Sequence, residues 1–173
     1  MTDYRRPCPL DPAVHDRSGF VCREAAYAEW LRRYAGQNRK ANTAATWVIA
    51  DGEQHVMAYA TLSMTAVDIS TAPGALRKAA PDPVPALLIG RLAVDERHEG
   101  LGLGTELVKH VLATALELNE SAAFKAVVVT ALNDDARTRW RDRLEFEPFD
   151  PDDPDNCDLY LLTSTISATL ESS

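Results

Sequence analysis

The sequence has few cysteines and no long apolar run, and each shortage excludes a class of protein. Its three cysteines, Cys8, Cys22 and Cys157, are too few and too scattered for a disulfide framework. No Cys-x-x-Cys motif or His/Cys cluster is present, so we expect no zinc site and no other bound metal. No run approaches the roughly 20 apolar residues of a membrane span. Because the N-terminal residues also lack the hydrophobic segment of a signal peptide, we expect a cytoplasmic protein with no membrane attachment.

Length and charge set further bounds. With 173 residues, 46% of them hydrophobic, the chain can bury one core but is short for two, so we expect a single domain with residues 1–17 and 164–173 irregular. The formal net charge of −8 is unevenly spread, since residues 1–40 come to +3 and the rest to −11. An acidic body repels nucleic acid, whereas a basic face near the start can still dock a phosphate backbone. More commonly, arginines of this kind simply form the solvent-exposed face of a helix.

The stretch at residues 87–105 has the clearest chemical meaning. Apolar residues at 87–89 and 92–94 predict one buried strand that ends at Asp95. Three alternating glycines follow at 100, 102 and 104, and apolar residues then recur at helical spacing. Glycines let the backbone approach a ligand closely, and the first turn of a helix has unpaired N–H groups and a partial positive charge. We therefore predict a phosphate or diphosphate site in this loop, with a purely structural loop as the alternative.

The loop lacks the Lys-Ser/Thr of a P-loop, and its place in the chain fits a dinucleotide fingerprint poorly. It resembles instead the acetyl-coenzyme A motif of the GNAT acetyltransferases: Arg or Gln, two residues, Gly, one residue, then Gly or Ala. Residues 97–102 fit by spelling, but the distance from the strand favours residues 99–104, which puts Glu99 where Gln or Arg is usual. This departure matters little if backbone amides bind the diphosphate, although a carboxylate so close would weaken the binding. The resemblance implies these cofactor-binding residues: Leu92, Ala93, Val94, Glu99, Gly100, Leu101, Gly102, Leu103, Gly104, Thr105 and Asn133.

Strand and helix patterns alternate along the rest of the chain, which indicates an α/β or α+β class with a mixed sheet. We expect an irregular or edge segment at residues 1–20. A helix should begin at Cys22, bury Ala26, Trp30 and Tyr34, and end at Gly36 before a basic loop at 37–42. The remaining expected elements are strands at 46–50 and 56–63, a helical turn at 73–78 ended by Pro81, Pro83 and Pro85, a helix at 103–119, a strand at 126–132, a helix at 136–143, a solvated turn at 150–158 and a strand at 159–163.

Four segments extend the resemblance to the GNAT toxins of bacterial toxin–antitoxin pairs: FVCREAA (20–26), WLRRYA (30–35), PDPVP (81–85) and GRLAVD (90–95). It covers residues 18–163 and implies the GNAT fold, a mixed sheet split in the middle with helices on both faces. It also implies that the chain acetylates the free α-amino group of aminoacyl-tRNA, which blocks translation until a ribbon-helix-helix antitoxin neutralises the enzyme.

The resemblance also suggests which cations would hold tRNA phosphates: Arg91, Arg77, Lys78, Arg39 and Lys40. Surface solubility explains Arg77 and Lys78 equally well. Arg91 is different, because a charge flanked by Gly and Leu on an inner strand is costly without a partner. We also expect a homodimer.

The usual general acid is missing. In the family a backbone N–H polarises the thioester carbonyl, here near residues 92–94, and a Tyr in an Asn-x-x-Ala-x-x-Phe-Tyr pattern protonates the departing thiolate. Residues 133–140 read NDDARTRW, which puts Trp140 in the tyrosine's place, while counting back from Phe146 puts Arg141 there. Neither side chain is a competent acid. Asn133 would bond the pantetheine, cap the helix, or do both.

Two explanations for the missing acid stay open. Tyr160 or a water protonates the thiolate, with a rate lowered by roughly 10²-fold, or the chain is a catalytically weakened module that binds acetyl-coenzyme A. An N-acetyltransferase for a small amine or a protein is the further alternative.

Overall fold

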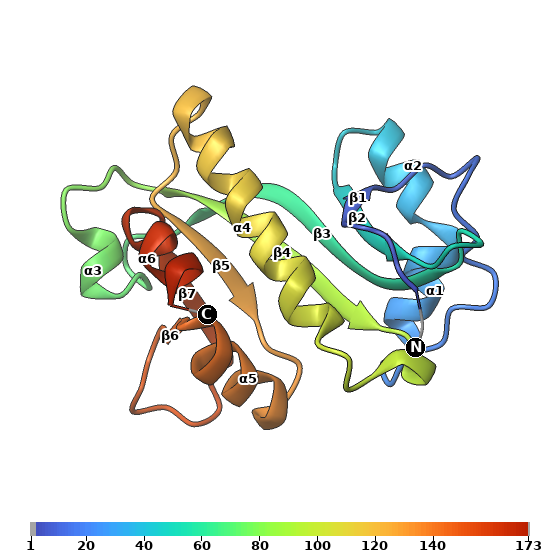
Figure 1. Ribbon diagram of the computed structural model, residues 1–173. Coiled ribbons are helices and arrows are strands. Elements are labelled where there is room, and N and C mark those ends of the chain that lie inside the picture. Colours follow the sequence, from blue (N-terminus) through green and yellow to red (C-terminus); the bar gives the residue numbers. More distant parts are fainter. Residues whose placement is uncertain (1–2, 173) are drawn as a thin grey trace. The chain divides into compact units, whose positions relative to one another are not determined.

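The computed structural model of the chain describes residues 3–172 (Figure 1). Its strands are β1 (Cys8–Pro9), β2 (Ala45–Ala50), β3 (Val56–Val67), β4 (Val84–Val94), β5 (Ala126–Thr130), β6 (Glu147–Pro148) and β7 (Asp158–Leu162). Its helices are α1 (Ala25–Arg33), α2 (Ala35–Lys40), α3 (Gly74–Arg77), α4 (Leu103–Ser121), α5 (Asp134–Leu144) and α6 (Ile166–Glu171), with short 3-10 turns η1 (Glu96–His98) and η2 (Thr163–Thr165). No helix in the part of the chain that the structure describes is long and apolar enough to cross a membrane.

The strands form a seven-stranded sheet with the order β1-β2-β3-β4-β5-β7-β6. β4 and β5 run parallel, whereas β1 with β2, β2 with β3, β5 with β7 and β6 with β7 are antiparallel. The sheet is therefore mixed, which confirms the predicted fold class. The chain divides into two compact units, one made of the residues up to Ser63 with Gly90–Val111, the other of Met64–Ile89 with Leu112–Ser173. That the whole chain acts as a single domain stays a prediction.

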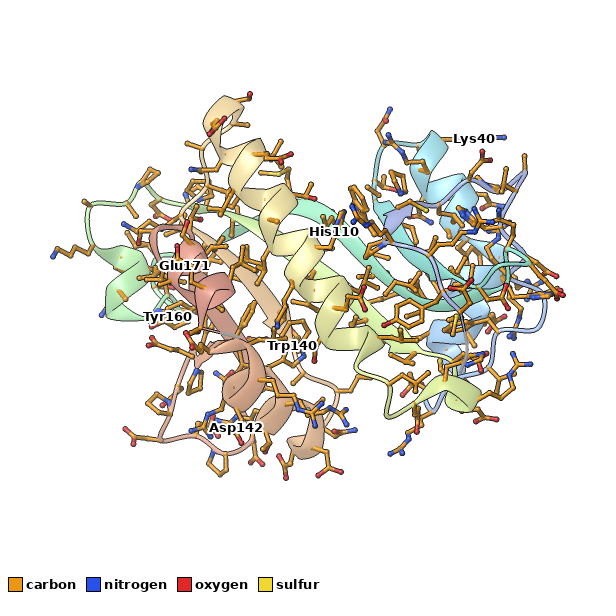
Figure 2. All side chains as sticks on the ribbon, in the orientation of Figure 1. Lys40, His110, Trp140, Asp142, Tyr160 and Glu171 are labelled. Carbon is orange, nitrogen blue, oxygen red and sulfur yellow. The ribbon has the colours of Figure 1, made fainter. Side chains whose placement is uncertain are left out.

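In the first unit, helices cover both faces of the sheet. Val48 of β2 lies in a buried cluster with Trp30 and Leu31 of α1. The ring of the adjacent Trp47 lies 4.9 Å from the ring of His110 on α4, which Figure 2 labels. Because successive strand residues point to opposite faces, α1 and α4 lie on opposite sides of β2. The same double cover explains why the first seven residues of β3 are all buried.

In the second unit, one face of the strands packs against α3. Val84 and Ala86 of β4 form a buried cluster with alternate residues of β5, Tyr160 of β7, and Leu76 of α3. The pairs Ala86↔Ala126 and Val128↔Tyr160 are aligned in register across neighbouring strands, so the cluster is built from one face of the sheet. The first four residues of β5 are all buried, so the other face of this strand is covered as well.

The expected first helix differs from the observed one in two ways. The buried residues of α1 are Ala28, Trp30 and Leu31, whereas Ala26 and Tyr34 are exposed, so the apolar stripe is rotated from the predicted one. The helix ends at Arg33, and α2 begins at Ala35 and runs through the segment that we expected to be a basic loop. Gly36 lies within α2 and is not among the positive-φ glycines, so it cannot act as a left-handed cap.

Two other expectations were wrong. Pro85 does not end an element but lies inside β4, close to its start, where a missing N–H is tolerated. The segment at 164–172 is not frayed: it contains η2 and α6, because Ile166 and Thr169 are buried and the side chains of Thr169 and Ser172 donate hydrogen bonds to Glu145. Ser173 lies outside the described residues. The remaining expected elements are confirmed within a few residues, and the short strand β6 was not foreseen.

Candidate functional site

The end of β4 leads directly into the glycine loop. The ladder between β4 and β5 runs from Ala86↔Ala126 to Ile89↔Val129, and β4 itself continues to Val94. In this continuation Ala93 is buried while Leu92 and Val94 are half-buried. The strand therefore extends past its parallel ladder over the residues predicted to polarise a carbonyl with a backbone N–H.

The loop itself requires glycine at two positions. Gly100 and Gly102 have φ of 81° and 78°, a left-handed conformation that other residues adopt only with strain. A Cβ on either would meet nothing within 4 Å, so the backbone there has open space beside it. Leu103 is buried and begins the 19-residue helix α4. The N–H groups of its first turn have no acceptor within the helix, so the loop and the helix start offer backbone donors of the kind that bind anions, and the predicted phosphate site here stays a prediction.

Glu99, the departure from the usual motif, is not a bare carboxylate. Arg23 donates from Nε to Oε1 at 3.0 Å and from Nη2 to Oε2 at 2.9 Å, a bidentate pair. The Arg23 side chain is 79% exposed and that of Glu99 35% exposed. The charge that was expected to disturb the anion site therefore has a cationic partner from a segment far away in the sequence.

Asp95 fastens the segment before α1 to the segment before the loop. Its side chain is fully buried and accepts from the backbone N–H of Val21 at 3.1 Å and from the Arg97 guanidinium at 2.7 and 2.8 Å. Arg97 also donates to the carbonyl of Gly19. Burial by itself would raise the pKa of the Asp95 carboxyl, but the hydrogen bonds from Arg97 and Val21 outweigh it, and the pKa is lowered.

Arg91 has the partner that its position on an inner strand demands. Its guanidinium carbon lies 4.3 Å from the centroid of the Trp30 ring and 6.0 Å from that of Tyr27. Trp30 is in turn stacked on Tyr59, whose hydroxyl donates to the carbonyl of Tyr27 at 2.7 Å. This cation–π contact offsets the cost of partial burial and fixes the guanidinium against a rigid aromatic group.

In the second unit, Trp140 and Arg141 occupy different environments on α5. Trp140 is only 8% exposed and packs edge-on against Phe146, with ring centroids 4.9 Å apart. Arg141, the next residue, is exposed, and Figure 2 shows Asp142 on the far side of the helix from Trp140. The indole is thus a packed core group, and the guanidinium a solvated one. Their predicted places in the acid position stay predictions.

Tyr160 on β7 is buried at 6% exposure and already has a hydrogen-bond acceptor. Its hydroxyl donates to Oε2 of Glu147 at 2.8 Å, and its ring packs edge-on against Phe149. Burial, together with this bond and the charge of Glu147, raises the pKa of Tyr160 to about 12. The phenol keeps its proton but is a weaker acid than free tyrosine. Its role as substitute acid stays a prediction.

Asn133 caps α5, since its side-chain oxygen accepts from the N–H of Ala136 at 2.9 Å. The structural alternative for this residue is therefore confirmed, and its pantetheine role stays a prediction.

Of the expected phosphate-binding cations, Arg77 ends α3, Lys78 follows it, and Arg39 and Lys40 end α2. All four are exposed.

Comparison with known proteins decides the family. The acetyltransferase (GNAT) family model matches residues 13–146. This chain belongs to the GNAT family. It is also similar to the tRNA-acetylating toxin of Mycobacterium tuberculosis (strain ATCC 25618 / H37Rv), with 32% identity over 153 residues that cover 87% of this chain and 90% of the relative.

Two solved structures support the GNAT fold independently. One is AtaT complexed with acetyl-methionyl-tRNAfMet, with a TM-score of 0.84, 23% identity and coverage of 96% of this chain and 98% of that chain. The other is a tyrosine-to-phenylalanine mutant of the AtaT toxin bound to the C-terminus of the antitoxin AtaR and acetyl-CoA, with a TM-score of 0.80, 24% identity and coverage of 96% and 97%. At this level of identity, the likeness shows the GNAT fold alone.

The sequence predicted the glycine loop and the helix after it, but not the contacts that Arg23, Asp95 and Trp30 make around them. These contacts join residues that are distant in the sequence: Arg23 with Glu99, Asp95 with Val21, and Trp30 with Arg91. For Asp95 a local signal existed, because an Asp at a strand end commonly accepts from the backbone N–H two residues on, as it does here from Arg97, and so caps the turn that follows. For Arg23, 76 residues from Glu99, the sequence holds no such signal.

Proposed function

We propose that this chain transfers the acetyl group of acetyl-coenzyme A to the free α-amino group of an aminoacyl-tRNA and thereby blocks translation. The observation that carries the proposal is the likeness, over most of both chains, to the mycobacterial toxin whose name states that it acetylates tRNA. The GNAT membership of this chain supplies the acetyl-transfer chemistry.

The loop fits the cosubstrate. The open space beside Gly100 and Gly102 admits a diphosphate against the backbone, and the N–H groups of residues 100–105 are donors of the kind that bind it. Residues 92–94 would polarise the acetyl carbonyl with a backbone N–H. Acetyl-coenzyme A supplies an activated acetyl group, and no residue proposed here requires a metal ion.

The nucleic acid would be held by local cations, because the net charge of −8 gives no general attraction. Arg91 is the best placed of them. Its cation–π contact with the Trp30 ring does not use the N–H groups of the guanidinium, which can then donate to a phosphate. Arg39, Lys40, Arg77 and Lys78 would contribute further phosphate contacts.

We also propose the partners and the place of action. The AtaT structure with the C-terminus of its antitoxin supports a similar antitoxin for this chain, and a ribbon-helix-helix protein is the type that we expect. A homodimer acting in the cytoplasm, where charged tRNA and acetyl-coenzyme A are both found, completes the proposal.

Two observations favour a second candidate, a module that binds acetyl-coenzyme A with weakened catalysis. Trp140, which the register from Asn133 puts in the tyrosine's place, is packed against Phe146 in the core, and Tyr160 already donates to Glu147. An acetyltransferase for a small amine or a protein is the third class.

One experiment separates the three. Acetyl-labelled acetyl-coenzyme A is incubated with the protein and, in separate reactions, with charged tRNA, polyamines and total protein. We expect label on charged tRNA. Label on polyamines or protein alone would favour the third class, and coenzyme A binding without any transfer would favour the binding module.

A further inference from the structure

The residue before the glycine loop is negatively charged, whereas a phosphate site favours a neutral or positive residue there. Glu99 directly precedes Gly100, and its carboxylate stands at the edge of a site built from backbone N–H groups and a helix N-terminus. A negative charge there lowers the local potential and competes with an incoming diphosphate for the same donors. Something must offset this charge if the loop is to bind coenzyme A well.

Arg23 is placed to do so. It pairs with both carboxylate oxygens of Glu99. Hydrogen bonds also join the two backbone segments that lead into Arg23 and Glu99. The N–H of Glu96 donates to the carbonyl of Val21 at 2.9 Å, and Asp95 accepts from the N–H of Val21. The pair thus lies on a fixed frame, unlike an ordinary surface ion pair between two mobile segments.

The pair contributes little to folding. Arg23 is 79% exposed, and exposed ion pairs are typically worth only a fraction of a kcal/mol because water and salt screen them. When a ligand covers the loop, it excludes water from the space beside Glu99. The Glu99 charge is then screened less and acts more strongly on the ligand. The consequence of the pair should therefore appear in ligand affinity and not in the stability of the free protein.

We infer that Arg23 is a positioning residue of the coenzyme A site: it neutralises Glu99, holds the carboxylate away from the loop amides, and so restores the electrostatics that Gln or Arg gives at this position in other GNAT proteins. The ligand class is a diphosphate ester. The inference rests on the proposed use of acetyl-coenzyme A and adds a residue that no motif assigns.

The test is a double-mutant cycle in coenzyme A binding, measured by calorimetry on the full chain at low salt. Arg23→Ala leaves Glu99 unpaired and should weaken binding about three- to tenfold. Glu99→Gln should bind at least as tightly as the unmodified chain. The double variant Arg23→Ala/Glu99→Gln should return to within about twofold of it, because no carboxylate then remains to be neutralised.

Four further measurements complete the test. Arg33→Ala breaks the exposed Arg33–Glu29 pair, whose shortest N–O distance is 2.8 Å, and as a matched control should leave binding unchanged. The loss in Arg23→Ala should shrink at high salt. It should persist with 3′-dephospho-coenzyme A, which retains the diphosphate. Thermal unfolding of Arg23→Ala without ligand should match that of the unmodified chain.

The inference is overturned if Arg23→Ala binds normally, or if the double variant stays as weak as Arg23→Ala, since Arg23 would then act by direct contact or through the fold. Failure of the unmodified chain to bind coenzyme A is a separate outcome, and it would overturn the proposed cosubstrate as well.

Discussion

At the scale of single residues, the chemical behaviour of several side chains depends on one contact each. Arg91 lies on Trp30, Glu99 is paired with Arg23, and the Tyr160 hydroxyl is bonded to Glu147. In each case the sequence gives the chemical type of the residue, while its behaviour depends on a group that lies elsewhere in the chain. Removal of that partner or charge should therefore change how the residue behaves.

Asp95 makes the stability of the chain sensitive to acid. Its folded pKa is lowered, so its bonds contribute stability above the unfolded pKa of about 3.9, and this contribution is lost as the pH falls through the folded value. Asp95→Asn should lower the free energy of unfolding at pH 7 by about 2 kcal/mol, a typical value for hydrogen bonds to a charged group. It should also lose less stability than the unmodified chain between pH 7 and pH 3.

Urea unfolding at the two pH values measures both effects. Asp152→Asn, an exposed carboxylate in the solvated turn, is the matched control and should behave like the unmodified chain. If Asp95→Asn is as stable as that control at pH 7, the buried carboxylate does not fasten the two segments as we describe.

The missing acid makes a second residue-scale prediction. Trp140→Tyr should raise turnover on charged tRNA if the register from Asn133 is right, and Arg141→Tyr should do so if the register from Phe146 is right. A phenol with a pKa of about 10 is a better proton donor than either native side chain. We expect one of the two to gain activity, with Trp140→Tyr favoured, and Tyr160→Phe to lower the native activity.

Thermal unfolding accompanies these assays, because Trp140→Tyr removes volume from a buried contact with Phe146, whereas exposed Arg141 tolerates replacement. If neither gain is seen and Tyr160→Phe is silent while coenzyme A still binds, the missing-acid account is wrong and the binding module becomes the better description.

At the scale of elements, the strand, glycine loop and helix at residues 84–121 could be predicted almost completely. Their signals are local: an apolar run, two glycines forced to positive φ, and an apolar repeat that begins at Leu103. The first helix was predicted less well, because Ala26 and Ala28 are alike in sequence and only packing against β2 and β3 decides which is buried. The end of the chain was missed because α6 is anchored by Glu145, which no local pattern indicates.

The glycine loop carries the element-scale prediction. Gly102→Ala forces a Cβ into the left-handed region at φ 78°, which costs roughly 1–2 kcal/mol, and should lower both the stability and the coenzyme A affinity of the chain. Gly52→Ala is the matched control, since its Cβ also meets nothing within 4 Å but its φ is not positive. Equal effects of the two changes on binding would show that the loop conformation is not what binds the ligand.

At the scale of the whole molecule, the sequence was sufficient to predict the fold class and the family. The fold class follows from the alternation of strand and helix patterns, and the family from the glycine loop and four further motif segments. The candidate site was predictable only where one continuous motif forms it, in the residues from Leu92 to Thr105. The cations Arg39, Lys40, Arg77 and Lys78 lie on α2 and next to α3, and their contribution to RNA binding depends on the bound state. The acceptor, and not the cosubstrate, is therefore the central claim to test.

The most direct measurement uses one tRNA in two forms, charged with a free α-amino group or charged with that group blocked by a formyl group. Each is incubated with the protein and acetyl-labelled acetyl-coenzyme A, and the label on RNA is counted before and after mild base, which cleaves the aminoacyl ester. Our account predicts label only on the free-amine form and its complete release by base. Label on both forms, label that survives base, or no label despite coenzyme A binding would contradict it.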